Sequence, residues 1–348
     1  MRQTNTRLRN GTSARHHGGG WRFIKSAQLA SAALVALVLV MPCALAQKPA
    51  GYPARLVRII VPYSPGIGVD TVARVIAAKL AERSGQAVIV ENKAGASGLI
   101  GTEMAARAAP DGHTLVMAVN TLVITASTRP VPFDPVRDFA PVIKIGTGAF
   151  LLTIHPSLPA RDLNELIAHA KSRPGKVNYG SSGAGTPAHL ATELLKQQAG
   201  IDLFHVPYKG LPPSVIGHVN GDVAVMIAPL EMVRPHIATG RVKAVAATGA
   251  QRSPLLPDLP TITELGYPNV SLDLWYGLLA PAGTPPAIIA WLNAEVGQLL
   301  GLAEIQEVLR KQSVVASPGT PVEFGALIRD DLAKWKKLAA TTNIRFED

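Results

Sequence analysis

Short apolar runs alternate with segments of helical periodicity from about residue 56 onward, and turn-forming residues separate them. Residues 70–83 place Val72, Ile76 and Leu80 on one face of a helix, which ends at a Ser-Gly pair. The strands expected around this helix are 56–61, 87–90 and 114–119, and a second helix follows the loop 92–98 and ends at Ala109. This βαβαβ order predicts a parallel α/β sheet in the first third of the chain.

The middle of the chain repeats this alternation, and the tail is mainly helical. The helices expected in the middle are 161–172, 188–198, 213–219 and a short one ending at Gly240, and the strands are 177–179, 203–206, 223–228 and 242–247. The proline-rich stretch 253–260 is predicted to be a surface loop. The helices expected in the tail are 286–300, 303–311 and 321–340.

Two apolar segments, 142–154 and 270–280, are interpreted as connections between two α/β lobes. If both segments cross, the first lobe is built from both ends of the chain and the second from its middle. The predicted lobes are 52–148 with 273–348, and 149–272. We therefore expect an α/β fold with a cleft between two lobes, which two crossing strands join and which hinge motion can close.

Residues 1–46 differ from the rest of the chain and are interpreted as a signal peptide. A basic leader without acidic residues precedes the apolar run 29–41, which is short for a membrane span. Ala44 and Ala46 are small residues at the positions that a signal peptidase reads, so cleavage is expected before Gln47. An uncleaved membrane anchor is the alternative interpretation.

Composition narrows the class of protein further. The 348 residues are 47% hydrophobic and carry a formal net charge of +10, but six of the basic residues lie in the leader. The remaining charges are mixed along the chain, which argues against nucleic-acid binding. The single cysteine, Cys43, also lies in the leader, so the mature chain has no disulfide, thiolate metal site or cysteine nucleophile. An exported chain without cysteine fits a periplasmic location.

Known enzyme and nucleotide motifs are incomplete in this sequence. The stretch GIGVDT at 66–71 lacks the third glycine of a dinucleotide-binding fingerprint, where Thr71 stands. The stretch GSSGA at 180–184 has Ala184 in place of the last glycine of a nucleophile elbow. No histidine pair has the spacing of a zinc protease, so no metal or cofactor is expected. His189 and His205 are interpreted as structural residues.

Three loops that carry Gly, Ser or Thr each follow an expected strand and precede an expected helix, at 64–69, 92–98 and 180–186. Glycine lets the backbone come close to a ligand, and the unpaired N–H groups of a helix N-terminus can hold a carboxylate or phosphate. Loops at the carboxyl ends of parallel strands line the usual ligand crevice. Each loop taken alone is also compatible with an ordinary turn between a strand and a helix. Asp70 is also compatible with the role of a helix cap.

A series of longer motifs resembles one known family across 52–343. The matching segments include YPARLVRIIVP at 52–62, PGIGVD at 65–70, VENKAGASGLIG at 90–101, VPFDPVRDFAPV at 131–142, YGSSGAGTPAHL at 179–190, HVPYKG at 205–210 and GLLAPAGTPP at 277–286. In this order they are similar to the substrate-binding receptors of tripartite tricarboxylate transporters, also called Bug or TctC-like receptors. The resemblance implies a periplasmic binding protein type II-like fold. It also implies a monomer without catalytic activity, which delivers a small organic acid to a two-subunit membrane permease.

The resemblance also implies which residues contact the ligand. The first loop and strand end would supply Tyr63, Ser64, Gly66, Ile67, Gly68, Val69 and Asp70, the loop after strand 114–119 would supply Asn120, and the second lobe would supply Ser181, Ser182, Thr186 and Ala228. Relatives commonly carry glycine where Ile67 stands, Ser or Thr at Val69 and often aspartate at Ala228. Because Ala228 cannot pair with an ammonium group, we expect a non-amino carboxylate with some apolar surface.

Two alternative functions stay open at this point. A sensor-type receptor that signals to a membrane kinase would have the same fold. An exported serine hydrolase would use Ser181 or Ser182 with His189 or His205, and the incomplete elbow motif argues against it.

Overall fold

The long strand β4 (Phe139–Ile154) connects two groups of strands in the computed structural model, which describes residues 47–341. The described strands form one sheet in the order β2-β1-β3-β9-β4-β7-β5-β6, with β8 and β10 also paired to β4. The other strands are β1 (Val57–Val61), β2 (Val88–Asn92), β3 (Thr114–Val119), β5 (Val177–Ser181), β6 (Leu203–Pro207), β7 (Val225–Pro229), β8 (Lys243–Ala247), β9 (Asp273–Pro281) and β10 (Val315–Ala316).

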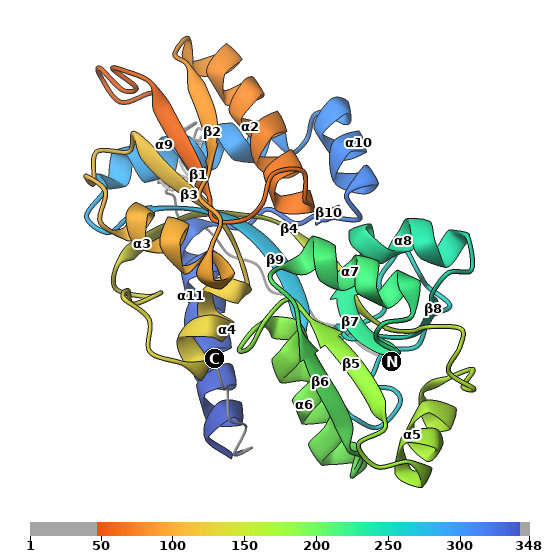
Figure 1. Cartoon of the computed structure of the whole chain (residues 1–348). Helices are drawn as coiled ribbons and strands as arrows, with labels where there is room; N and C mark the ends of the chain where they lie inside the picture. Colours follow the sequence, from red (N-terminus) through yellow and green to blue (C-terminus); the bar gives the residue numbers. More distant parts are fainter. Residues whose placement is uncertain (1–46, 342–348) are drawn as a thin grey trace, which may run out of the picture. The chain divides into compact units, whose positions relative to one another are not determined.

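Helices alternate with these strands along most of the chain (Figure 1). The described α-helices are α2 (Gly68–Ser84), α3 (Leu99–Ala106), α4 (Thr121–Thr128), α5 (Leu163–Ser172), α6 (Pro187–Ala199), α7 (Leu211–Asn220), α8 (Leu230–Ala238), α9 (Pro286–Leu299), α10 (Ala303–Lys311) and α11 (Pro321–Thr341). Two short 3-10 helices are η1 (Ala96–Gly98) and η2 (Pro268–Val270). The predicted βαβαβ pattern of the first third is confirmed, because β1 pairs in parallel with both β2 and β3.

The sheet has two regions that differ in their partners along β4. Residues Phe139 to Ala149 of β4 pair antiparallel with β9, whereas Phe150 to Ile154 pair with β7. We call β1, β2, β3, β9 and the first part of β4 the first sheet region, and β5, β6, β7, β8 and the last part of β4 the second sheet region. Figure 1 shows β4 and β9 running between the two groups of elements. The proposed lobe boundaries at 148/149 and 272/273 stay predictions, because contacts group all residues from Lys48 onward into one unit.

One sequence-based expectation needs correction. The loop expected after β3 is wrong, because Asn120 begins helix α4 directly. The β-branched residues of α4 favour a strand locally, but Leu122, Val123 and Ile124 are buried and the helix packs against α11. Beyond the first third of the chain the sheet is mixed, since β4 pairs antiparallel with β7, β8, β9 and β10. The predicted signal peptide at 1–46 lies outside the described residues.

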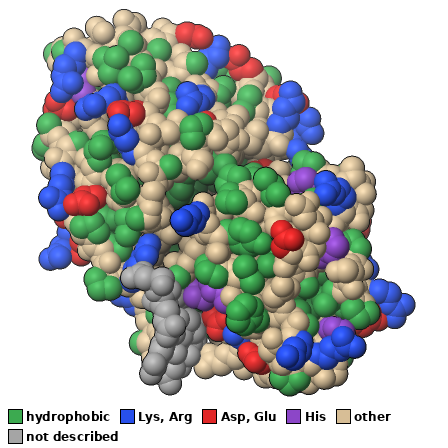
Figure 2. All heavy atoms as spheres, in the orientation of Figure 1, with side chains coloured by type: hydrophobic (Ala, Val, Ile, Leu, Met, Phe, Trp, Pro, Cys, Tyr) green, Lys and Arg blue, Asp and Glu red, His purple; other side chains and the backbone are tan. Residues whose placement is uncertain are grey.

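Charged side chains of both signs are interspersed on the face that Figure 2 displays. Many form exposed ion pairs within one turn of a helix, such as Arg310 with Glu307 of α10, which contribute little to stability. Across residues 47–341, no single helix has both the length and the apolar composition of a membrane span. The pair α9 and α10, bent by 82°, meets these criteria when taken together.

The buried centre of the first sheet region depends on a glycine in β9. Trp275 packs edge-on against Phe324 of α11, with ring centroids 5.3 Å apart, and its indole Nε1 donates to Asp331 over 2.8 Å. Phe324 lies directly over Gly277, and a β-carbon there would collide with the phenyl ring. Gly277 therefore lets α11 lie against β9.

We expect Gly277→Ala to lower the free energy of unfolding by about 1–3 kcal/mol, because the added methyl group overpacks a filled core. Denaturant unfolding measures this. Gly297→Ala is the matched control: Gly297 lies inside α9, and its added β-carbon would be 3.8 Å from Ile143. The control should stabilise the protein by about 0.5–1 kcal/mol. Equal effects of the two variants would contradict this account of Gly277.

Candidate functional site

A cavity of about 630 Å³ lies between the two sheet regions. Its walls come from the segments that follow β1, β2 and β3 on one side and β5, β6 and β7 on the other. Residues of β4 and β9 also reach it, namely Phe150, Leu274 and Tyr276. Within each sheet region these segments meet because the carboxyl ends of neighbouring parallel strands lie at one edge.

Six described α-helices begin at this cavity. The first residues or N-caps of these helices that line the cavity are Gly68 of α2, Gly98 of α3, Asn120 of α4, Thr186 of α6, Gly210 of α7 and Pro229 of α8. A helix N-terminus carries a partial positive charge and unpaired N–H groups. The starts of α6, α7 and α8 contain Pro187, Pro212, Pro213 and Pro229, which have no N–H to donate. The described wall of the cavity therefore favours an anionic ligand through the partial charges of all these helix starts and through N–H donors at only some of them.

The N-terminus of α2 offers the clearest pair of donors. Ile67 is the N-cap residue, and no side chain caps the helix. The amides of Gly68 and Val69 have no acceptor inside the helix, and no other acceptor from residues 47–341 reaches them. Both residues line the cavity. These two N–H groups are available to a ligand carboxylate.

Asp70 holds the loop before α2 in place. Its carboxylate accepts hydrogen bonds from the Gly66 amide (2.8 Å), the Arg74 guanidinium (3.0 Å) and the Asn92 side chain (2.8 Å). Burial alone would raise the pKa of Asp70, but these hydrogen bonds together lower it below its ordinary value. The Gly66 amide is thus already bound, and the carboxylate is directed to the loop.

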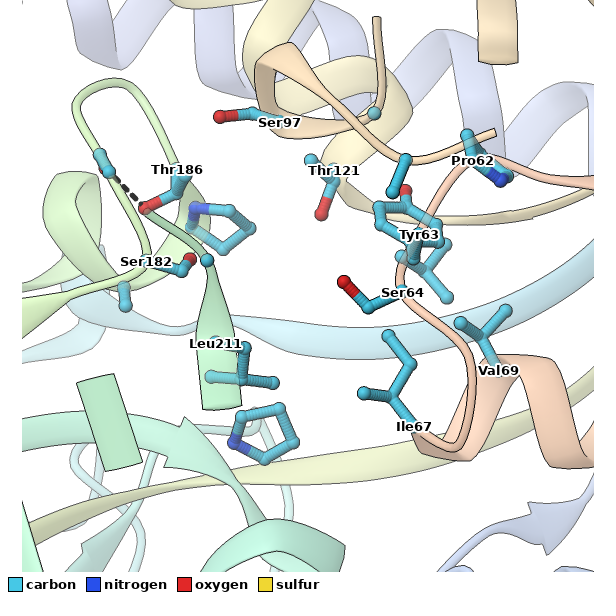
Figure 3. Close-up of a pocket in the computed structure, with 18 of the residues that line it drawn as sticks. Pro62, Tyr63, Ser64, Ile67, Val69, Ser97, Thr121, Ser182, Thr186 and Leu211 are labelled. Atoms are coloured by element: carbon cyan, nitrogen blue, oxygen red, sulfur yellow. Dashed lines mark hydrogen bonds between the residues drawn. The ribbon is translucent and has the colours of Figure 1, made fainter. Parts of the chain in front are cut away.

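Side-chain hydroxyl groups face the cavity from both sheet regions (Figure 3). Figure 3 shows Ser64 and Thr121 on one side and Ser182 and Thr186 on the other. Thr186 donates to the Gly183 carbonyl over 2.7 Å, so its hydroxyl oxygen can accept a bond from a ligand. Hydroxyl groups on opposite walls can contact the two ends of one small ligand.

Asn120 adds a buried amide to the cavity wall. Its Nδ2 donates to the Asp273 carbonyl over 2.6 Å, which fixes the orientation of the amide. Its Oδ1 is buried and has no hydrogen-bond partner among the described residues. An unsatisfied buried acceptor is costly, so this oxygen favours a ligand or water that donates a hydrogen bond.

Apolar side chains occupy much of the remaining wall. Ile67 and Leu211 approach the same space from opposite sides in Figure 3, and Val69, Ile227 and Phe150 also line it. A ligand with a hydrocarbon portion would bury apolar surface against them, which stabilises the complex by about 25 cal/mol per Å².

Only two charged side chains line the described cavity, and they differ in environment. Lys209 is exposed in the loop between β6 and α7. Glu231, in the first turn of α8, has its carboxyl group between Tyr276 and the first turn of α2. The Tyr276 hydroxyl lies 3.3 Å from Oε1, and Oε2 is buried without a partner among the described residues. Burial raises the pKa of Glu231 to about 7, against the opposing effects of its own amide, Tyr276 and Arg234.

The twelve sequence-predicted contact residues divide into two sets. Those that line the cavity are Tyr63, Ser64, Ile67, Gly68, Val69, Asn120, Ser182 and Thr186. Those that the structure places outside its lining are Gly66, Asp70, Ser181 and Ala228. Ligand contact itself stays a prediction for all of them.

Ala228 points into the core rather than into the cavity. It pairs with Leu151 of β4 and packs with Val215 and Leu230. Its neighbours Ile227 and Pro229 line the cavity, since successive side chains of a strand point to opposite faces. Glu231 was not predicted from the sequence to line the site. Its position in the first helical turn after an apolar strand could have indicated that its side chain lies at the ligand crevice.

Ser181 makes a hydrogen bond with His205 (Oγ to Nε2, 2.7 Å), as a nucleophile and base would. The His205 ring stacks on His189, with centroids 4.1 Å apart. Ser181 is nevertheless completely buried and outside the cavity lining, so a substrate in the cavity does not meet its hydroxyl group. The described residues contain no cluster of three or more His, Cys, Asp or Glu side chains arranged for a metal ion.

Comparisons with known proteins agree with this geometry. Residues 72–344 match the family model described as the tripartite tricarboxylate transporter family receptor. The structure of Rpa4515 from R. palustris, with adipate, is 35% identical and covers 84% of this chain and 99% of its own, with a TM-score of 0.78. MatC from Rhodopseudomonas palustris, with bound malate, is 31% identical with a TM-score of 0.76, and covers 83% of this chain and 100% of its own.

The periplasmic binding protein BugD is also similar, at 29% identity with a TM-score of 0.76, over 84% of this chain and 99% of its own. The expected periplasmic binding protein-like α/β fold is confirmed by these neighbours. The family model covers well over half of the chain. The chain therefore belongs to the tripartite tricarboxylate transporter receptor family.

Proposed function

We propose that this protein is an extracytoplasmic solute receptor that binds a small organic acid in the cavity between its two sheet regions. It then delivers the acid to a two-subunit membrane permease and does not transform it. The observation that carries the proposal is the convergence of six helix N-termini on one cavity. The solved relatives with adipate and malate support a carboxylate as the ligand.

In this mechanism the free amides of Gly68 and Val69 bind one carboxylate group of the ligand. Hydroxyl groups of Ser182 and Thr186 contact the ligand from the second sheet region. Approach of the two regions excludes water and lowers the local dielectric, which strengthens each polar contact. Micromolar affinity requires about 8 kcal/mol, and one helix terminus supplies about 0.3–2 kcal/mol. Several donors and the apolar wall therefore act together.

The ligand in this proposal is a non-amino carboxylate with a hydrocarbon portion, which Ile67 and Leu211 enclose. The protein works in the periplasm as a monomer after removal of residues 1–46. A receptor that signals to a membrane kinase would bind the same ligand, and capture of the membrane partner distinguishes it from a transport receptor.

Thermal unfolding against a panel of carboxylic acids tests the ligand class. We expect an acid present at about a hundred times its dissociation constant to stabilise the folded state by about 2.7 kcal/mol. Adipate and malate belong in the panel, with aspartate and glutamate as amino-acid counterparts. Sugars and nucleotides should give no shift. A shift with sugars or nucleotides but with no organic acid would refute the proposal, and exclusive binding of amino acids would refute the non-amino ligand.

Ser64→Ala tests the role of the loop before α2 without altering the core, because Ser64 is exposed at the cavity. Loss of one hydrogen bond should weaken acid binding by about 0.5–1.5 kcal/mol, roughly two- to tenfold in Kd, with little change in unfolding temperature. Calorimetric titration measures the change. Ser172→Ala, in the exposed last turn of α5, is the control and should leave Kd unchanged. Unaltered affinity in Ser64→Ala would remove this residue from the site.

Turnover assays address the absence of catalysis. We expect no hydrolysis of an ester panel, because the Ser181 hydroxyl is buried away from the cavity and His205 is bonded to Ser181 rather than to Ser182, which lines it. Hydrolysis that Ser181→Ala or Ser182→Ala abolishes would instead establish the serine hydrolase.

A further inference from the structure

Glu231 is the only acidic side chain in the described lining of a cavity whose other features favour an anion. Glu231 belongs to α8, which follows β7 of the second sheet region. Its carboxyl group, however, lies against Tyr276 of β9 and Gly68 of α2, on the side of the first sheet region. A β-carbon on Gly68 would lie 3.0 Å from Oε1 of Glu231 and 3.3 Å from the Tyr276 hydroxyl. The carboxyl group therefore lies against the same α2 turn that presents the free amides to the ligand.

The groups around Glu231 provide no direct charge partner. Tyr276 of β9 contributes a neutral hydroxyl, which is buried. Arg234 of the same helix is exposed and donates to the Lys311 carbonyl. Asp70 of α2 turns its carboxylate to Gly66, Arg74 and Asn92.

Lys209, the other charged residue of the lining, is exposed in the loop between β6 and α7. The buried Oε2 of Glu231 also has no hydrogen-bond donor among the described residues. Burial of a carboxyl group without a cation or a full set of donors favours its neutral form.

A ligand carboxylate on the α2 amides would place a second negative charge next to this carboxyl group. Two neighbouring carboxylates in a desolvated site cannot both ionise without a large electrostatic cost, so one of them takes up a proton. The ligand carboxylate has two free helix amides as partners. Glu231 has only its own amide and the Tyr276 hydroxyl, and its buried Oε2 has no donor among the described residues. The proton therefore goes to Glu231.

We propose that binding of an organic acid in this cavity is coupled to protonation of Glu231, which makes the receptor proton-linked and selective for acids without an ammonium group. This inference rests on the proposed function of the same cavity. An ionised Glu231 would instead attract an ammonium group and repel a second carboxylate. The neutral form removes the repulsion and leaves an O–H donor beside the ligand.

The direction of the pH dependence follows from proton linkage. In the ligand-free protein Glu231 titrates near pH 7, and a bound anion raises its pKa further. Below about pH 7 the side chain is already protonated, and affinity should be independent of pH until the ligand itself titrates. Above pH 7 Glu231 takes up one proton for each ligand that binds, so Kd should rise by up to about tenfold per pH unit.

Calorimetric titration with adipate and malate between pH 6 and pH 8.5 tests the coupling, in buffers of different ionisation enthalpy that report proton uptake. Wild-type protein should bind either acid progressively more weakly above pH 7, with about one proton taken up per ligand. Glu231→Gln, which mimics the neutral form, should bind with no such slope and no proton uptake. Glu304→Gln is the matched control, because Glu304 is also the second residue of its helix, α10, but is exposed.

Each outcome decides the matter. Loss of the slope in Glu231→Gln but not in Glu304→Gln supports the coupling. The same slope in all three proteins, or acid binding that tightens as pH rises, overturns it while the receptor function stands. Glutamate binding that tightens with rising pH and disappears in Glu231→Gln overturns it as well. Failure of every carboxylic acid in the panel to bind overturns the coupling and the receptor function together.

A ligand-free measurement tests the protonation of Glu231 separately. The raised pKa of the folded state means that wild-type protein loses stability as pH rises from the unfolded-state pKa of Glu231 through about 7. Glu231→Gln does not titrate there, so its unfolding temperature should exceed that of wild-type protein at pH 8 and approach it at pH 5. A difference that is the same at both pH values overturns the inference, and Glu304→Gln should show no such growth.

Discussion

The convergence of helix N-termini on one cavity is the constraint on which the rest of this structure depends. Partial positive charges at the starts of α2, α3, α4, α6, α7 and α8 repel one another when no anion lies between them. The fold imposes this arrangement, because each of these helices follows a strand whose carboxyl end lies at the cavity. A carboxylate relieves the repulsion, so affinity for an acid is built into the backbone and needs no arginine in the described lining.

The same arrangement explains why glycine is the first residue of α2. Gly68 leaves room for Glu231 and Tyr276 to approach the first helical turn, and a larger residue would separate the two sheet regions there. Ile67 and Val69 flank this glycine and present apolar surface instead of additional hydroxyl groups. Backbone groups thus provide the attraction for the anion, while the flanking side chains determine which hydrocarbon portion fits.

Much of this fold follows from local sequence, because strands and helices alternate with clear apolar periods. The helices 303–311 and 321–340 and the strand 114–119 lie within one residue of their expected bounds. Helix α4 was not predictable in this way, since its β-branched residues are helical only through burial. In the site, the side chain of Ala228 faces away from the cavity because of strand alternation, and the Gly66 amide is occupied by Asp70. The first depends on the register of β7 in the sheet. The second depends on the orientation of the Asp70 carboxylate, which Asn92 of β2 also binds.

The position of β9 has a consequence for how the chain reaches its folded state. β9 lies between β3 and β4, although the entire second sheet region precedes it in the sequence. During synthesis, the facing edges of β3 and β4 therefore stay unpaired until the last part of the chain emerges. Pairings between such distant segments form slowly. A chain that cannot complete its first sheet region early remains unfolded for longer, with two open strand edges that invite pairing with other chains.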